Sequence, residues 1–592
     1  MQRAGLRVCI FAKGSFVPLF AELGADVVEL PGEDYEHIFR EAAVRDALAT
    51  GRNMSVSFAL DRSLQSEADE AGCLHAVVEG LREFRPTVVV WHMSLPIEAI
   101  VAARLFGCHT VCLTFFPSAP TREIPCFVLA ATRLRKPGKI TKATHRVLWK
   151  YCYPFGQRRR LEHAFRMYGV SITGADVYAM FRSPDRPMIC AWSSQLSPLP
   201  KDCHAGVQQP GGFFTWGCAD MERSFPLPKE LQDFVEATER DRLVYVGWGS
   251  MGCGSDDRLT ELAVAALQLA GARGVIQGGY SDLRLEFIKD TKLKEYAESN
   301  VFFIRKDQSV PHSWLFPRCG ACVHHGGAGT VASCLSAGTP SVVTPVYLDQ
   351  HYWAHRVAVA GVGLRGPPLA STSAHTLGGL LRICLEDLRD GTGQLHAGAE
   401  SMSLAMLAED GATQAAGFVL SLCSRTPSKQ QARPRQEKPS TGELGQEAAE
   451  DSEEDTAEAS PDVLSFEPSP GLPSPVGSYA EMPRQACQQQ LRQQRDWRVI
   501  PGVDGRDRAG PRAAPRGEPP LHADWPPGQL CGPEAPGGNA PEAPSGIGIC
   551  EQLLVMAERL GRAVVRGSDI FIARCSEGQQ HFHRTVLLEC AH

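Results

Sequence analysis

Short apolar runs alternate with longer amphipathic stretches through roughly the first 425 residues of the chain. Six of these runs are rich in β-branched and aromatic residues and predict buried parallel strands: residues 7–11, 87–91, 110–115, 243–248, 321–325 and 341–345. Residues 257–272 and 329–338 have the spacing of amphipathic helices. The alternation predicts an open α/β fold whose parallel strands are joined by right-handed helical crossovers.

The predicted strands fall into two groups, which indicates two domains. The first sheet would end near Phe213 and the second would begin near Asp241, with the proline-rich sequence FPLPK at residues 225–229 between them. We therefore expect an N-terminal domain over residues 1–213, a linker over 214–240 and a C-terminal domain over 241–425.

The composition changes beyond residue 425. Residues 439–483 contain no lysine or arginine, residues 443–458 are crowded with acidic side chains, and the stretches that follow are rich in proline and glycine. Such a sequence buries too little apolar surface to offset its ordering entropy, so disorder is expected over residues 426–545. Residues 546–592 regain apolar periodicity, and the sequence leaves the role of that small segment open.

Composition and charge narrow the class of protein. The chain has 592 residues, of which 43% are hydrophobic, enough to fill real cores, and its net charge of −7 gives no general attraction to nucleic acid or to an anionic membrane. Its 20 cysteines show no disulfide-framework spacing. Cys319 and Cys322 form a C-x-x-C inside an apolar run with no second pair, so a buried structural role in a reducing compartment is expected and a zinc site is not.

Targeting signals are the next class to consider. No N-terminal stretch has the pattern of a signal peptide, and no run reaches about 18 apolar residues. We therefore expect a cytoplasmic protein that at most lies on a membrane surface.

The sequence VHHGGAGTV at residues 323–331 follows a predicted strand and opens a predicted helix. A glycine turn at this place presents free backbone N–H groups and the positive end of the helix dipole, and together these bind anions, most often phosphate. A Walker A loop is excluded because no Gly-Lys-Ser/Thr follows.

A dinucleotide site is an alternative for the same loop. Gly327, Gly329 and Ala332 fit the G-x-G-x-x-G/A pattern, and Asp349 follows Gly329 by twenty residues. The acidic residue of that fingerprint should close the next strand, whereas Asp349 lies in the loop beyond the run at residues 341–345. A dinucleotide-dependent oxidoreductase therefore stays open as an alternative function.

Four polar residues around this loop suggest what the anion carries. A histidine beside a phosphate loop can donate to a diphosphate and offset charge on a leaving group. Strand alternation places His324 and His325 on opposite faces, so one of the two is expected simply to end a buried strand. Asp349 and Gln350 pair a carboxylate with an amide, which suits a polyol, although a plain solvated loop is the alternative. A phosphate site and a polyol site on one sheet edge predict a nucleotide-sugar site.

At this point the sequence resembles a known family. Residues 309–363, which include VPHSWLFPRCGACVHHGGAGTV, resemble the donor-binding block of UDP-glycosyltransferases, and within them that of the sterol 3-beta-glucosyltransferases. Residues 243–251, 190–203 and 110–127 resemble further segments of that family. The resemblance covers roughly residues 6–423 and none of the tail.

The resemblance implies a GT-B fold, in which two Rossmann-like domains face a cleft and the C-terminal one holds most of the UDP-glucose. It also implies inverting, metal-independent transfer of glucose to the 3-hydroxyl of a sterol or similar lipid, with no cofactor besides the donor; the chain contains no Asp-x-Asp motif. By the same resemblance, Gly249 and Ser250 would approach the phosphates from a first loop, and His312 would lie near the uridine. The diphosphate would be held by His325, Gly327, Gly329 and Thr330. Glucose hydroxyls would be bound by Asp349 and Gln350.

The N-terminal part departs from the family pattern. There the family has a first strand and a loop with an aspartate that acts as the general base, whereas the sequence from residue 6 matches the second strand and has no carboxylate in the corresponding loop. No catalytic base is therefore assigned, and loss of a base typically costs about 10²–10⁴ in rate.

This departure leaves three interpretations open: a truncated form of an active transferase; a non-catalytic nucleotide-sugar-binding or regulatory protein; and a transferase with another acceptor or with a base from elsewhere. In the last case the base would be sought among Asp26, Asp34, His37 and His92.

Residues 145–165 mix aromatic residues with Arg158, Arg159 and Arg160. The pattern fits a helix that reaches a membrane surface, or equally a helix packed on its domain with a solvated basic face.

Overall fold

The structure is a computed structural model, and it describes residues 2, 5–22, 24–32, 35–51, 67–127, 138–212, 227–305, 308, 310–390 and 393–424. The expected disordered tail, the segment 546–592, half of the expected linker and Asp34 lie outside these residues. Among the described residues, no helix combines the length and the apolar character needed to cross a bilayer.

Six parallel strands form the sheet of the C-terminal half, in the order β12-β11-β10-β7-β8-β9. Their bounds are β7 Leu243–Gly247, β8 Arg273–Gln277, β9 Val301–Ile304, β10 Ala321–His324, β11 Ser341–Val343 and β12 Gly363–Arg365. The three strands predicted in this half are confirmed as β7, β10 and β11. β8 and β12 went unpredicted because they are short and each contains arginine and glycine, which mask an apolar run.

Strand β7 shows why this sheet is buried on both sides. Its residues Val244 and Val246 belong to one apolar cluster and Leu243 and Tyr245 to another, and all are buried. Alternate side chains of a strand point to opposite faces, so each face meets its own layer of helices.

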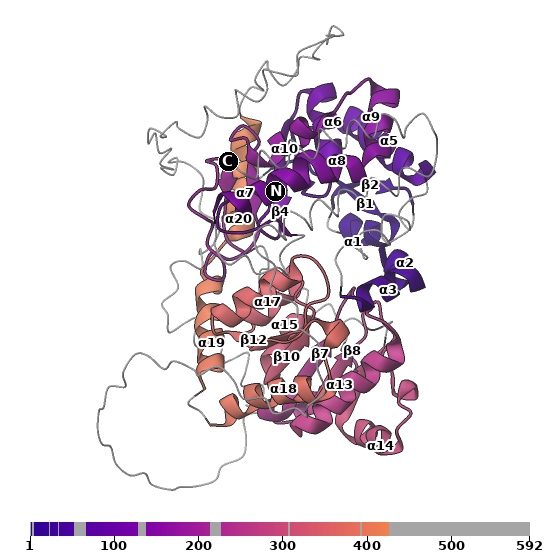
Figure 1. Cartoon of the computed structure of the whole chain (residues 1–592), viewed down its shortest axis with the longest axis vertical. Helices are drawn as coiled ribbons and strands as arrows, with labels where there is room; N and C mark the ends of the chain where they lie inside the picture. The colour runs from indigo at the N-terminus through magenta and orange to yellow at the C-terminus, as the bar shows by residue number, and fades with distance from the viewer. Residues whose placement is uncertain are drawn as a thin grey trace, which may run out of the picture. The chain divides into compact units, whose positions relative to one another are not determined.

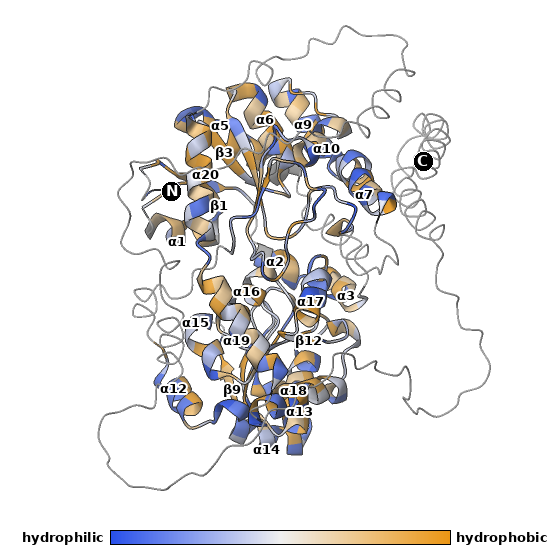
Figure 2. Ribbon diagram, turned by 90° about the vertical axis from the view of Figure 1, so that its left-hand side faces the viewer, coloured by the Kyte–Doolittle hydropathy of each residue, from blue (hydrophilic) through white to orange (hydrophobic). Residues whose placement is uncertain are grey.

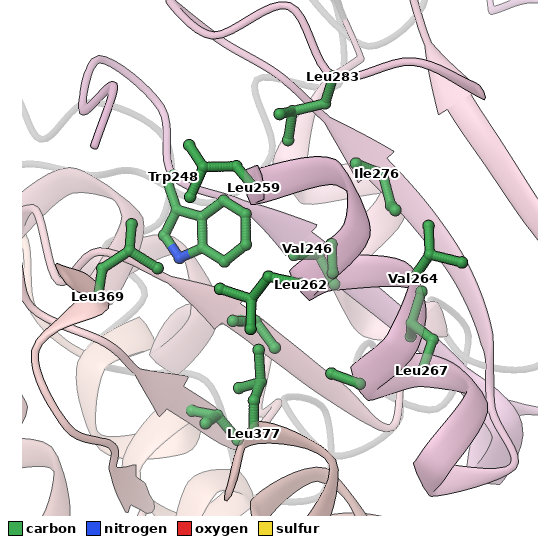
Figure 3. Close-up of a cluster of buried hydrophobic side chains, with 14 of the residues drawn as sticks. Val246, Trp248, Leu259, Leu262, Val264, Leu267, Ile276, Leu283, Leu369 and Leu377 are labelled. Atoms are coloured by element: carbon green, nitrogen blue, oxygen red, sulfur yellow. The ribbon is translucent and has the colours of Figure 1, made fainter. Parts of the chain in front are cut away.

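One of these layers consists of α13 (Asp256–Ala270) and α18 (Ala374–Arg389), which lie side by side over the strands (Figure 1). Figure 3 shows part of the cluster beneath them, with the indole of Trp248 among leucine and valine side chains. The predicted helix at 257–272 is thus confirmed as α13, which ends where Gly271 turns into the left-handed region at φ 64°. The other helices of this half are α12 Lys229–Glu236, α14 Thr291–Asn300, α15 His312–Leu315, α16 Ala328–Ser336, α17 Gln350–Val359, α19 Gln394–Leu407 and α20 Gly411–Cys423.

The N-terminal strands lie in two parallel sheets, not in the single sheet expected. β1 (Cys9–Lys13) pairs with β2 (Asp26–Leu30), and a second sheet has the order β3-β4-β5-β6. The strands of the second sheet are β3 Val88–His92, β4 His109–Thr114, β5 Met188–Cys190 and β6 Val207–Gln208. The two sheets remain separate because no described strand pairs with both β1 and β3. In Figure 2, β3 is coloured largely as hydrophobic, as expected for a strand covered on both faces.

Helix α5 (Glu67–Phe84) links the two N-terminal sheets by packing. Leu81 of this helix is buried in a cluster that also includes Phe11 of β1 and Val89 of β3. The other helices of this half are α1 Val17–Glu22, α2 Tyr35–Arg40, α3 Ala42–Ala49, α6 Pro96–Phe106, α7 Lys139–Arg146, α8 Tyr153–Gly156, α9 Arg158–Tyr168 and α10 Gly174–Arg182.

Two helices pack away from their neighbours in sequence. Val44 and Leu48 of α3 are fully buried in the same apolar cluster as Trp248, so this N-terminal helix packs on the C-terminal sheet. Conversely, Val419 of α20 is buried with Val111 of β4 in the N-terminal half. Apolar clusters therefore join residues from before and after the expected linker.

Candidate functional site

The predicted glycine loop joins β10 to α16 in the structure. Gly326 has φ 92°, and a Cβ there would lie 2.7 Å from Val343 Cγ1, so the turn needs glycine at this position. Gly327 is the N-cap of α16 and no side chain caps the helix. The first N–H groups of α16, which include those of Gly329 and Thr330, therefore have no intrahelical partner and no capping side chain. Thr330 lies in this first turn and is half-buried.

The ring of His325 lies between two glycines. A Cβ added to Gly249 would come within 3.0 Å of His325 Cε1, and one added to Gly327 within 2.5 Å of Nε2. His325 is 8% exposed, and its Nδ1 has no hydrogen-bond partner among the described residues. Burial, with a smaller contribution from His324, lowers the pKa of His325 to about 3, so its ring is neutral at pH 7. The site thus holds a neutral imidazole with a nitrogen still able to bond.

His324 has different surroundings. It is fully buried, and its Nδ1 accepts a hydrogen bond from the Gly326 N–H at 3.0 Å. This bond holds the backbone turn, so His324 shapes the loop. Its Nε2, like Nδ1 of His325, is buried with no hydrogen-bond partner among the described residues.

The loop after β7 lies against the same histidine. Gly249 has φ 56°, and its carbonyl accepts from the Tyr280 N–H at 2.9 Å. A Cβ on Gly279 would stand only 2.1 Å from that carbonyl oxygen, so Gly279 is required for the close approach of two chain segments. Gly279 was not predicted as a site residue, although a glycine pair directly after a strand was a signal for it. Ser250 follows Gly249 and is half-buried.

Asp349 and Gln350 open α17, beside the glycine loop. A Cβ on Gly326 would lie 3.1 Å from the carbonyl oxygen of Gln350. The Gln350 Oε1 accepts from the Val346 and Tyr347 N–H groups, both at 2.9 Å, so the amide oxygen is used internally and its NH2 end is the part left for a ligand.

The Asp349 side chain is positioned differently. Trp353 Nε1 donates to its Oδ2 at 3.2 Å, and burial of the carboxyl raises its pKa to about 7. Asp349 is the N-cap of α17 and comes six positions after the last residue of β11. It therefore does not close a strand, as the acidic residue of a dinucleotide fingerprint does.

His312 begins α15 and is half-buried. Its ring stacks on Phe316 at 4.2 Å between centroids and meets Tyr245 edge-on at 5.8 Å. Burial, with a smaller contribution from the neighbouring His324, lowers the pKa of His312 to about 4. The structure thus brings Gly249, His325 and Gly327 into contact and sets Gln350 against the same loop, whereas His312 packs on Phe316 and Tyr245.

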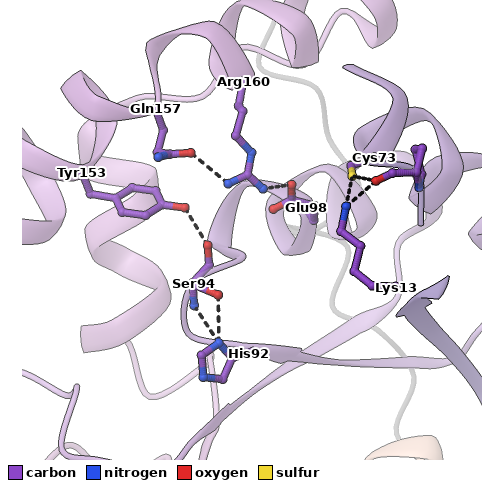
Figure 4. Close-up of polar contacts among 9 residues, drawn as sticks. Lys13, Cys73, His92, Ser94, Glu98, Tyr153, Gln157 and Arg160 are labelled. Carbon is purple, nitrogen blue, oxygen red and sulfur yellow. Dashed lines mark hydrogen bonds and ion pairs between the residues drawn. The ribbon is translucent and has the colours of Figure 1, made fainter. Parts of the chain in front are cut away.

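The proposed base positions lie in different places. Asp26 begins β2, at the amino end of that strand, and pairs with Arg7 at 3.3 Å. His37 lies in α2. His92 is the last residue of β3, is exposed, and its Nδ1 lies 2.8 Å from Ser94 Oγ (Figure 4). Desolvation of the ring lowers the pKa of His92, although the residue as a whole is exposed. Because ligands of parallel α/β sheets bind at the carboxyl ends of strands, His92 is the one of these three at a functional edge.

Comparisons with known proteins find one matching family model and several similar proteins. Residues 294–418 match the family described as the C-terminal domain of erythromycin biosynthesis protein CIII-like proteins. A sterol 3-beta-glucosyltransferase of Arabidopsis thaliana is 35% identical over 240 residues, which make up 40% of this chain and 34% of that protein. A terpene cyclase-glycosyl transferase fusion protein of Humicola fuscoatra is 29% identical over 355 residues, or 57% of this chain and 25% of that protein. The chain thus covers about a third or less of the length of these relatives.

Solved structures of glycosyltransferases superpose on most of the chain. The spinosyn forosaminyltransferase SpnP has a TM-score of 0.47 and 16% identity, and covers 72% of this chain and 93% of its own. The glycosyltransferase VinC, solved in complex with dTDP, has a TM-score of 0.44 and 19% identity, and covers 72% of this chain and 94% of its own. Because these scores are low, the α/β class with parallel sheets is assigned from the strand order of the chain itself.

Proposed function

The chain is related to the UDP-glycosyltransferases and has parallel α/β sheets resembling those of GT-B glycosyltransferases, and from this premise we propose that it transfers glucose from UDP-glucose to the 3-hydroxyl of a sterol or similar lipid. The observation that carries the proposal is the unpartnered Nδ1 of His325, held between Gly249 and Gly327 at the uncapped start of α16.

This geometry suits a diphosphate leaving group. When the acceptor oxygen attacks the anomeric carbon of glucose, the bond from that carbon to the diphosphate oxygen breaks and negative charge grows on UDP. The free N–H groups of α16 and the positive end of its dipole stabilise that charge, and a proton on His325 Nδ1 would add a hydrogen bond. Attack from the face opposite the leaving group inverts the configuration at the anomeric carbon.

Asp349 and Gln350 are proposed to bind the glucose. The free NH2 end of Gln350 can donate to a hydroxyl, and the Asp349 carboxylate can accept from one. Since the backbone of Gln350 lies against the phosphate loop at Gly326, and Asp349 directly precedes it, the two groups are proposed to recognise the sugar and not the nucleotide.

The acceptor hydroxyl must lose a proton, and we infer that His92 receives it. Its imidazole is exposed at the carboxyl end of β3, its lowered pKa keeps it neutral at pH 7, and the Nδ1 contact with Ser94 leaves Nε2 for the proton. An alternative function, nucleotide-sugar binding without transfer, requires the same donor site but no base.

The test is transfer of labelled glucose from UDP-glucose to a detergent-dispersed sterol by the full chain, with UDP binding measured by calorimetry. Transfer that falls to background in His92→Ala, with unchanged UDP affinity, supports the proposal and the base. UDP binding without transfer by the unaltered chain indicates the non-catalytic alternative. Failure to bind UDP, with tight binding of NADH, would refute the proposal in favour of the oxidoreductase.

A further inference from the structure

The stretch from residue 138 to 168 carries a charge opposite to that of the whole protein. It contains eight lysines and arginines and a single acidic residue, Glu162, whereas the chain as a whole has a net charge of −7. A concentration of one sign of charge on an otherwise acidic chain creates a local positive potential.

This stretch forms one long helical unit followed by a second helix. α7 continues without a break through a π-helical segment, Val147–Cys152, into α8, and α9 begins after a bend at Gln157. The inner side of α9 is anchored to the domain: Arg160 pairs with the buried Glu98 and donates to Gln157 Oε1 at 2.9 Å (Figure 4), and Ala164 is fully buried. One arginine of the run 158–160 is therefore structural, and the other two face outward.

We define the α9 outer face as Arg158, Arg159, Glu162, Phe165 and Arg166, all exposed. Glu162, Phe165 and Arg166 follow Arg158 by four, seven and eight positions, and Arg159 precedes Glu162 by three, so the five residues lie on one side of the helix. Glu162 lies 3.5 Å from Arg158 and 3.8 Å from Arg166, and no acidic side chain of the described residues pairs with Arg159. The face keeps a net positive charge.

Large apolar side chains are exposed among these cations. Phe165 is 60% exposed, and Phe155, at the end of α8, is 41% exposed. Met167 beside them is exposed as well. On the neighbouring α5, Glu79 already pairs with Arg82, so it does not cancel the charge of the α9 outer face. Phenylalanine beside arginine at a surface matches the boundary of an anionic bilayer, where cations meet lipid headgroups and aromatic rings enter the acyl region.

We propose that the α9 outer face, with Phe155, docks the protein on an anionic lipid bilayer. This inference rests on the proposed function in that it explains how a lipid acceptor would be reached. A bilayer accounts for the exposed aliphatic Met167 as well as for the phenylalanines and arginines, whereas a nucleic acid would use only the arginines and the aromatic rings, and is left as an outcome of the test.

The experiment is sedimentation of the full chain with vesicles of phosphatidylcholine alone or mixed with phosphatidylserine. We expect binding to the mixed vesicles only, weakening as salt is raised. The triple variant Arg158→Ala, Arg159→Ala, Arg166→Ala should bind about 100-fold more weakly, since each cation near such a surface is worth roughly fivefold. The matched control Lys201→Ala, Lys229→Ala, Lys292→Ala removes the same charge from exposed positions elsewhere and should bind normally.

Three single variants separate docking from general damage. Phe165→Gln should weaken binding several-fold, whereas Val359→Gln, at an apolar side chain that is also 60% exposed, should not. Glu162→Gln should strengthen binding roughly fivefold, a gain that a loss of structure would not produce.

Three outcomes would overturn the proposal. The triple variant could bind vesicles as well as the unaltered chain does, or the lysine control could lose as much vesicle binding as the triple variant. The triple variant could also lose binding to an RNA oligonucleotide while keeping its binding to vesicles. UDP affinity and transfer to a detergent-dispersed sterol are measured in parallel. Failed vesicle binding with intact UDP affinity removes the docking surface alone, and vesicle binding without UDP affinity removes the proposed function alone.

Discussion

Replacing His325 by alanine removes an imidazole that is buried between Gly249 and Gly327 and has an unpartnered Nδ1. The free protein holds this ring neutral, because burial lowers its pKa to about 3. With the proton on Nδ1, the neutral ring can donate one hydrogen bond to a phosphate oxygen of UDP. We expect the His325→Ala variant to fold and to bind UDP more weakly.

The magnitude follows from that single bond. A hydrogen bond to a charged group contributes about 1.5–3 kcal/mol, which corresponds to a roughly 10- to 150-fold increase in the Kd for UDP. The matched variant is His324→Asn, whose amide oxygen can replace the Nδ1 acceptor of the Gly326 N–H. This variant should change the Kd for UDP by less than about threefold and act mainly on stability.

Titration calorimetry with UDP measures both Kd values, and repeating it across pH tests the charge state. A neutral donor takes up no proton on binding, so the ratio of variant to unaltered Kd should stay constant between about pH 6 and 8. If the bound ring were an imidazolium, that ratio would change about tenfold per pH unit. Equal losses of affinity at positions 324 and 325 would refute the assignment of different roles to the two histidines.

Three further predictions concern the surroundings of this site. Asp349→Asn should weaken binding of UDP-glucose while leaving binding of UDP unchanged. Because burial raises the folded-state pKa of Asp349 to about 7, the ionised carboxyl destabilises the fold increasingly as pH rises from about 4 to 7. In thermal melts the variant should therefore gain about 1–4 kcal/mol of stability at about pH 8 and none at about pH 4. Arg45→Ala breaks a partly buried ion pair with Asp256 at 2.5 Å and should cost about 1–3 kcal/mol in denaturant unfolding, whereas an unchanged midpoint would mean that α3 is held by apolar contacts alone. A chain that ends at Ser424 should bind UDP with the affinity of the full chain in calorimetry, since every proposed donor residue precedes that point; a loss would mean that the tail contributes to the site.

The sequence predicted those parts of the fold that are determined by residues close together in the chain. β7, β10 and β11 are apolar runs buried on both faces, and the turn into α16 follows from glycines placed between a strand and a helix. The separate surroundings of His324 and His325 follow in part from strand alternation. These features depend on residues only a few positions apart, and the spacing of hydrophobic residues along the chain gives information over that distance.

Features that depend on tertiary packing could not be predicted in this way. Nothing local in α3 indicates that Val44 and Leu48 would pack beside Trp248, some 200 residues later. The close approach of Gly279 to the Gly249 carbonyl is also a contact between separate loops. The inward turn of Arg160 depends on the buried Glu98, although helical spacing alone would have separated it from Arg158.

The packing of α20 has a consequence for the order in which the chain matures. Its Val419 and Leu422 cover Val111 and Ile189 of the four-stranded N-terminal sheet. During synthesis at about 5–20 residues per second, this apolar face therefore waits roughly 10 to 50 s after Ile189 is made before its covering helix exists. The N-terminal half thus leaves the ribosome with an uncovered sheet, and we expect it to need a chaperone until residue 422 has emerged.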